Sequence, residues 1–210
     1  MKVIVRYKSI GRISLKGGKG SGFEDHAGRP GFVGGSASGN IGFPETGTIN
    51  EDVRKVIMDA TQNIVREFPE IKDTFKGFDY TGRDMGNLPM EYNKEEGKLL
   101  IHNYYARKYT VKDWEEMFEE TAPITVIGTS LKACILHEFG HVVHNTIRKK
   151  LSQDAFDVYW FKLKDLARIL PSPSQYAERS TNEWVAERLL LEMLGKADPI
   201  LKNLMKEYIQ

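Results

Sequence analysis

The sequence predicts an α+β domain in which a small mixed sheet packs on helices. Three short strand-like runs fall between residues 74 and 105, and turn signals separate them. The last third of the chain has helical periodicity that is interrupted mainly by proline and glycine. A block of strands followed by a block of helices is typical of the α+β class.

The overall composition excludes several classes of protein. The chain has 210 residues, with 30 Lys+Arg and 29 Asp+Glu, so its net charge is +1. This near-balance argues against binding to nucleic acid and against electrostatic attraction to anionic membranes. The single cysteine, Cys134, excludes an internal disulfide. There is no apolar run of membrane-spanning length and no signal-peptide pattern, so we expect a cytoplasmic location at synthesis.

Residues 1–48 differ in composition from the rest of the chain. Nine glycines and three serines lie between Gly17 and Gly39, with few bulky side chains among them. Such a segment buries too little apolar surface to offset the entropy of its backbone. We therefore expect a flexible arm or linker over residues 1–48 and a folded domain over residues 49–210.

Regular structure is expected from about residue 51 onward. Apolar residues at helical spacing predict a helix to Phe68, capped by Thr48 or Asn50 and stopped by Pro69. Strands are predicted over 74–80, 90–93 and 98–105, and an acidic helix over 110–120. Four helices then follow. The first is capped by Thr129 or Ser130 and runs to about Lys150, and the second is capped within 152–154 and ends before Pro171. The third is capped by Thr181 or Asn182 and ends near Gly195, and a short fourth follows Asp198-Pro199.

The most informative motif is His137-Glu138-Phe139-Gly140-His141, which falls in the first of these four helices. Residues four apart lie on one helix face, so the two imidazoles are positioned to bind one Zn²⁺. Glu138 is offset by one position and can take a proton from zinc-bound water. On a helical wheel the two histidines lie across the helix from its core stripe, where they can face a cleft.

A catalytic zinc site needs a third protein ligand. The pattern HExxHxxGxxH is excluded, because His144 and Ile147 stand where it requires glycine and histidine. A glutamate on a later helix is the other common arrangement. Glu183 and Glu187 fit it, because they are four residues apart on one helix face. Like charges at this spacing repel each other, and a metal bound by one carboxylate, with the other carboxylate orienting a ligand histidine, would offset that repulsion. A solvated acidic helix face is the alternative interpretation.

Together, HEFGH at 137–141, Tyr176-Ala177, Asn182-Glu183 and Ala186-Glu187 resemble the gluzincin metallopeptidases, and above all the anthrax lethal factor family. In that family a tyrosine follows the HEFGH helix, a ligand glutamate comes seven residues later, and another glutamate comes four residues after that. The same intervals separate the corresponding residues here. The resemblance covers about residues 131–194 and implies a zincin-like fold, with a zinc-binding HExxH helix and a later helix that carries the third ligand.

The resemblance also implies a role for each matching residue. It implies one Zn²⁺ per chain, with His137, His141 and Glu183 as its ligands. Glu138 would be the general base and acid, Tyr176 the hydroxyl donor to the oxyanion, and Glu187 a residue that supports the site from behind the ligands. The strand at residues 99–103 would be the edge strand with which that family pairs an extended substrate.

The glycine-rich arm has a resemblance of its own. Its runs Gly17-Gly18-Lys19-Gly20-Ser21-Gly22, His26-Ala27-Gly28-Arg29-Pro30-Gly31 and Val33-Gly34-Gly35-Ser36 are similar to a segment that recurs in tailed-phage head-morphogenesis proteins and polyproteins. This implies a phage or prophage origin and a processing site in the arm. It also implies phage head or virion proteins as partners, with the host cell or the virion as the location.

These observations predict a zinc-dependent endopeptidase with a protein or peptide substrate, in which Glu138 acts on a zinc-activated water. Two alternatives stay open: a virion-associated structural or interaction module with a non-catalytic zinc, and the same chemistry on another substrate such as a cell-wall peptide crosslink. His144 is expected at the pocket edge, because a fourth protein ligand would close the site. Cys134 is expected to be a small buried side chain. The basic run 148–150 suits the negative end of its helix dipole without any ligand.

Overall fold

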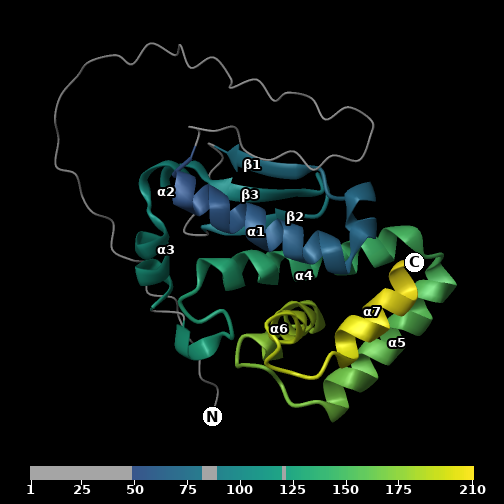
Figure 1. Ribbon diagram of the computed structural model, residues 1–210. Helices are drawn as coiled ribbons and strands as arrows, with labels where there is room; N and C mark the ends of the chain where they lie inside the picture. The colour runs from purple at the N-terminus through teal and green to yellow at the C-terminus, as the bar shows by residue number, and fades with distance from the viewer. Residues whose placement is uncertain (1–48, 82–88, 120–121) are drawn as a thin grey trace, which may run out of the picture. The chain divides into compact units, whose positions relative to one another are not determined.

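The computed structural model describes residues 49–81, 89–119 and 122–210 (Figure 1). The arm expected over residues 1–48 and the turn residues expected at 82 and 85–87 lie outside the described residues. Within the described ranges the protein is mostly helical, with seven α-helices and a three-stranded mixed sheet, which confirms the predicted α+β class. Among these helices, none combines the length and the hydropathy that a membrane span requires.

The sheet consists of β1 (Gly77–Thr81), β2 (Met90–Asn93) and β3 (Lys98–His102), in the order β1-β3-β2. The central strand, β3, runs parallel to β1 and antiparallel to β2. Its three successive residues Leu99, Leu100 and Ile101 are all buried, as expected for a strand covered on both faces. The expectation that residues 99–103 form an edge strand is therefore wrong, and β2 lies at an edge of the sheet that the described strands form.

The predicted strand over 98–105 is also too long. It ends at His102, whose Nδ1 accepts the N–H of Tyr104 at 3.2 Å and so caps a short helix, α2 (Asn103–Lys108). Aromatic residues favour strands, but only where their surroundings suit a sheet. Here the Tyr105 ring packs against the rings of Tyr109 and Trp114, which favours the helix. The helix α3 (Val111–Phe118) follows with a capping box at its start.

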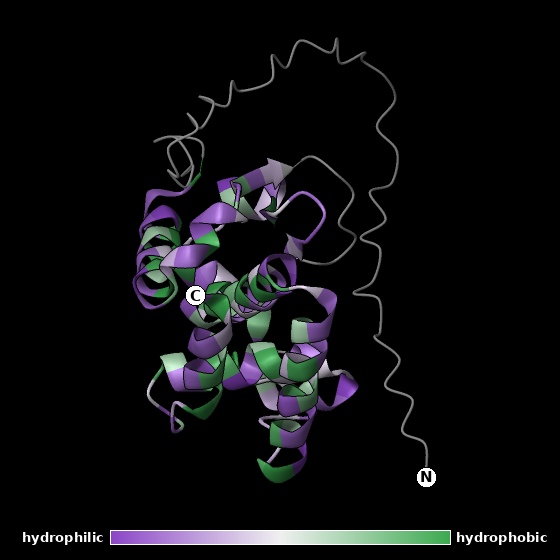
Figure 2. Ribbon diagram, turned by 90° about the vertical axis from the view of Figure 1, so that its right-hand side faces the viewer, coloured by the Kyte–Doolittle hydropathy of each residue, from purple (hydrophilic) through white to green (hydrophobic). Residues whose placement is uncertain are grey.

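The remaining helices are α1 (Glu51–Glu67), α4 (Leu131–Lys150), α5 (Gln153–Ile169), α6 (Thr181–Met193) and α7 (Ile200–Ile209). Asn50, Ser130 and Ser152 cap the first three, as the sequence predicts. The cap of α6 is Ser180, one residue before the expected position. Hydrophilic and hydrophobic residues alternate along these ribbons, as in amphipathic helices that cover a shared core (Figure 2).

The long helix α4 lies between two layers. On one side it contacts α1 and the edge strand β2, and on the other it contacts α6 (Figure 1). On the sheet side, the Phe139 ring meets the edges of the Phe75 and Phe78 rings, with the Phe75 and Phe139 centroids 5.1 Å apart. On the other side, a Cβ placed on Gly140 would lie only 2.7 Å from Cα of Ala186, so the glycine allows α6 to approach closely.

The chain after α6 is held by a buried carboxylate. Glu192 accepts the backbone N–H groups of Leu201 and Lys202, at 3.0 and 2.7 Å, in the first turn of α7. The guanidinium of Arg188 donates to the same carboxylate at 2.8 Å and to the carbonyl of Asp198 at 3.2 Å. A carboxylate at this position satisfies N–H groups that have no partner within α7.

Candidate metal centre

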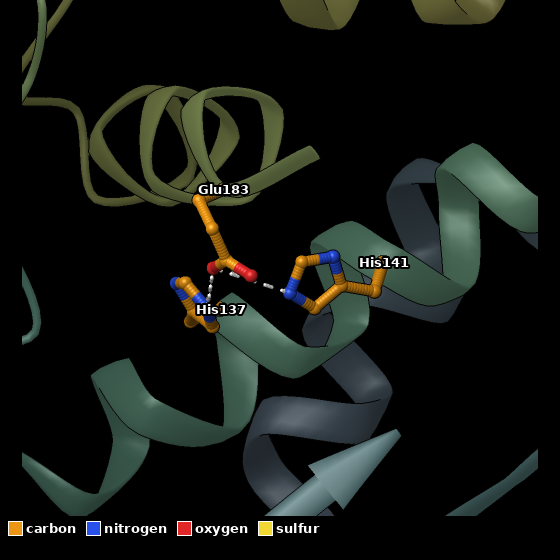
Figure 3. A group of neighbouring side chains, drawn as sticks. All are labelled: His137, His141 and Glu183. Carbon is orange, nitrogen blue, oxygen red and sulfur yellow. Dashed lines mark ion pairs between the residues drawn. The ribbon is translucent and has the colours of Figure 1, made fainter. Parts of the chain in front are cut away.

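Three side chains from two helices converge on one point. His137 and His141 lie one turn apart on α4, and Glu183 comes from the first turn of α6 and points at both imidazoles (Figure 3). Oε2 of Glu183 lies 3.3 Å from Nε2 of His137 and 3.6 Å from Nε2 of His141. The three potential ligand atoms all lie within 4.8 Å of one another, so the group could hold a metal ion.

The spacing of this group fits a small divalent cation. Tetrahedral zinc, with ligands at about 2.0–2.1 Å, separates neighbouring ligand atoms by about 3.3–3.4 Å. The two carboxylate–imidazole separations, 3.3 and 3.6 Å, agree with that value. Oε2 of Glu183 is also buried without a hydrogen-bond partner among the described residues. A buried oxygen of this kind is costly unless a cation or a donor satisfies it, and these residues therefore fit zinc.

The electrostatics of the group couple the carboxylate to the imidazoles. Burial alone would raise the pKa of Glu183, but His137 and His141 beside it outweigh burial and hold its pKa at about 2. Burial alone would lower the pKa of His141, but Glu183 and the charge of Glu138 outweigh it and raise the pKa. The carboxylate is therefore ionised at neutral pH and available as an anionic ligand.

Glu138 lies next to this group and is held by the sheet. Its Oε2 accepts the backbone N–H of Tyr92, in the edge strand β2, at 2.9 Å. Burial raises the pKa of Glu138 above its ordinary value, although the charges of the two imidazoles and the Tyr92 N–H act in the opposite direction. A carboxyl group with a raised pKa and a fixed orientation is suited to proton transfer near neutral pH.

Tyr176 faces the same pocket from the segment before α6. Its ring centroid lies 6.1 Å from that of His137, and the Arg179 guanidinium lies 4.5 Å from the centroid of the Tyr176 ring. The backbone N–H of Tyr176 donates to the carbonyl of Ile124 and to Oγ of Ser174, both at 3.0 Å. Two anchors therefore fix the backbone of this tyrosine.

Glu187 supports the tyrosine segment and forms no hydrogen bond or ion pair with either imidazole. It is fully buried one turn after Glu183, where Oε2 accepts the hydroxyl of Ser174 and Oε1 accepts the N–H of Val126 at 3.1 Å. The Ser174 hydroxyl oxygen in turn accepts the N–H groups of Tyr176 and Ala177. Nδ1 of His137 has no hydrogen-bond partner among the described residues. The carboxylate expected to orient a ligand histidine thus orients the Tyr176 backbone instead.

The metal-ligand group, Glu138 and Tyr176 share a pocket of about 370 Å³ that is lined by β2, α4, the Tyr176 segment and the start of α6. His144 also lines it, with Nδ1 3.2 Å from the hydroxyl of Tyr159, and it does not join the ligand group. Burial, together with the charges of His141 and Arg148, lowers the pKa of His144 to about 4. Cys134 is buried, as expected, and burial raises the pKa of its thiol.

Comparison of this chain with known protein families, with curated proteins and with solved structures finds no match. The resemblances to gluzincins and to phage proteins therefore stay predictions from the sequence.

Three contributors to the site are missing from the sequence-based prediction. The N–H of Tyr92 is a backbone group, and only the fold brings it to Glu138. Gly140 carries a readable signal, because glycine inside a helix is unfavourable unless close packing requires it. Ser174 also carries one, because a serine that bonds the N–H groups two and three residues ahead is a common turn device.

Proposed function

We propose that this protein is a zinc-dependent endopeptidase with a zincin-like fold. The observation that carries the proposal is the position of the Glu138 carboxylate, which lies in one pocket with His137, His141 and Glu183. A structural zinc site usually has four protein ligands and needs no general base beside it. Three convergent ligands with a neighbouring carboxylate instead support a catalytic site with one open position.

The residues divide the chemistry between them. A zinc ion bound here supplies Lewis acidity, which polarises a carbonyl and makes water acidic enough to lose a proton near neutral pH. His137, His141 and Glu183 hold the ion. Glu138 accepts the proton of the attacking water and later delivers it to the leaving amine nitrogen. The Tyr92 N–H on Oε2 fixes the carboxylate while this proton moves.

Tyr176 and β2 would orient the substrate. The Tyr176 hydroxyl is proposed to donate a hydrogen bond to the oxyanion, where a single donor contributes about 2.7–4 kcal/mol. Met90 and Tyr92, on the edge strand β2, line the pocket beside Glu138. An extended peptide that adds to this edge would run past Glu138, which makes β2 the substrate-pairing strand in place of β3.

The competing function is a structural or interaction module with a non-catalytic zinc. Glu138 and Tyr176 argue against it, because such a site requires neither residue. A phage origin, phage head or virion partners and a location in the host cell or virion rest on the arm sequence alone. The substrate class is a protein or peptide, and a cell-wall peptide crosslink would use the same chemistry.

Metal content and cleavage of a peptide library, measured on the same samples, test the proposal. By native mass spectrometry, we expect one zinc per chain in the wild type and in Glu138→Gln, and greatly weakened binding in Glu183→Ala. Only the wild type should cut peptides. Full activity of Glu138→Gln would refute the proposed role of this residue, and zinc binding without any cleavage by the wild type would favour the structural module.

A further inference from the structure

The pocket extends beyond the metal group along α4. His141, Asn145 and Arg148 all line it. Arg148 follows His141 by seven residues, which is two helical turns on nearly the same face and about 10 Å along the axis. The floor of the pocket therefore runs from the proposed reaction centre to a cationic end near the C-terminus of α4.

The cationic end is built from two elements that are fixed to each other. The Asn145 amide donates to the hydroxyl of Tyr92 at 2.8 Å, and Nζ of Lys149 donates to the carbonyl of Lys94 at 3.3 Å. These contacts hold β2 and the turn after it against α4. Lys94, in the turn after β2, and Arg148, on α4, both line the pocket.

Neither cation is neutralised within the described part of the chain. The Arg148 guanidinium lies 5.7 Å from the centroid of the Phe156 ring. No described carboxylate forms an ion pair with Arg148 or Lys94. Glu91 also lines the pocket and forms an ion pair with neither of them. The helix dipole accounts for a basic run at residues 148–150, but only Arg148 of that run lines the pocket.

We propose that Arg148, assisted by Lys94, binds an acidic side chain of the peptide substrate two or three residues from the bond that is cut. The inference rests on the proposed peptidase function and narrows its substrates to acidic peptides. An extended peptide advances about 3.3 Å per residue, so 10 Å corresponds to about three residues. A guanidinium binds a carboxylate through two parallel hydrogen bonds, a geometry that lysine cannot reproduce.

The test separates recognition from cleavage. Zinc-loaded Glu138→Gln, which is expected to leave peptides intact, is titrated with fluorescent octapeptides that carry a single Glu or Gln at successive positions. Fluorescence anisotropy should show at least one Glu peptide bound about 10-fold more tightly than its Gln counterpart. Adding Arg148→Gln should abolish the difference, and adding Arg148→Lys should restore part of it. Adding Lys150→Gln removes the same charge outside the pocket and should leave the difference unchanged.

Equal affinity for the Glu and Gln peptides, no binding of either, or a preference that survives Arg148→Gln would overturn the inference. Cleavage of the same peptides by the wild type tests the proposed function separately. Selective binding without any cleavage would refute the peptidase and retain the acidic site. Cleavage without an acidic preference would retain the peptidase and refute the acidic site.

Discussion

Replacing Gly140 by alanine tests how closely α4 and α6 must approach. The added Cβ would lie 2.7 Å from Cα of Ala186, 3.2 Å from its Cβ and 3.3 Å from its carbonyl oxygen. Two of these three atoms belong to the backbone of α6, which cannot rotate away as a flexible side chain can. Because Ala186 lies three residues after Glu183, the clash is one turn from the proposed third metal ligand.

Whether Gly140→Ala lowers or raises the free energy of unfolding distinguishes close packing at this position from open space. In an unobstructed helix, glycine to alanine stabilises by about 1 kcal/mol, whereas overpacking a core costs about 1–3 kcal/mol. A contact of 2.7 Å falls well short of van der Waals distance, so the clash should outweigh the helix propensity. We expect a net loss of about 1–2 kcal/mol in the free energy of unfolding. Displacing Glu183 from the imidazoles should weaken zinc binding by about 10–100-fold.

Urea unfolding of the metal-free protein measures the first quantity, and competition with a chromophoric chelator measures the second. Gly140→Ser and Gly140→Val extend the series, and both quantities should fall as the side chain grows. An alanine variant that is more stable than the wild type by about 1 kcal/mol, with unchanged zinc affinity, would refute the close approach of α4 and α6.

Three further predictions use other parts of the structure. The pKa of His144 is about 4 in the folded protein and about 6.5 in the unfolded chain, so the unfolded chain binds this proton first as the pH falls. The free energy of unfolding should therefore drop by about 3 kcal/mol between pH 6.5 and pH 4, and it should depend less steeply on pH in His144→Phe. Identical slopes in urea titrations of the two proteins would contradict this. Ser174→Ala removes a hydrogen-bond donor from the buried Glu187, so it should lower the free energy of unfolding by about 1–3 kcal/mol and slow cleavage, with zinc affinity unchanged. A parallel loss of zinc affinity would show that Glu187 acts on the ligands. Glu192→Ala strips the buried Arg188 of its carboxylate partner and should cost about 3–5 kcal/mol in unfolding experiments. A loss below about 1 kcal/mol would rule out the role of Glu192 in holding α7.

The features that the sequence predicted correctly depend on neighbours along the chain. Asn50, Ser130 and Ser152 cap their helices through contacts with residues two or three positions ahead. The two imidazoles of the HExxH motif share a face for the same reason, because four residues of helix fix their spacing. Glu183 was different, since its link to the histidines of another helix came from the need for a third ligand, from its spacing to Glu187 and from the resemblance to a family, and from no contact along the chain.

The features that the sequence missed depend on the tertiary arrangement. Strand order is set by which strand is covered on both faces, and the continuous apolar run Leu99-Leu100-Ile101 already indicated the central position of β3. The helix at Asn103–Lys108 was hidden by aromatic residues that favour strands in other surroundings. The partners of Glu187 come from Ser174 and from Val126, a residue 61 positions earlier, and no local pattern could have identified Val126.

Glu183 and Glu187, two of the three glutamates of α6, explain how one helix can set both halves of the site. Like charges one turn apart repel each other, but the imidazoles face Glu183 and two hydrogen-bond donors satisfy Glu187. Glu183 therefore positions the ligand group, and Glu187 positions Tyr176 through Ser174. Because Gly140 fixes the distance between α4 and α6, a shift of α6 would move the proposed third ligand and the proposed oxyanion donor together. Substitutions at Glu183 and Ser174 should separate these effects, because the first removes a proposed metal contact and the second only a support for the tyrosine backbone.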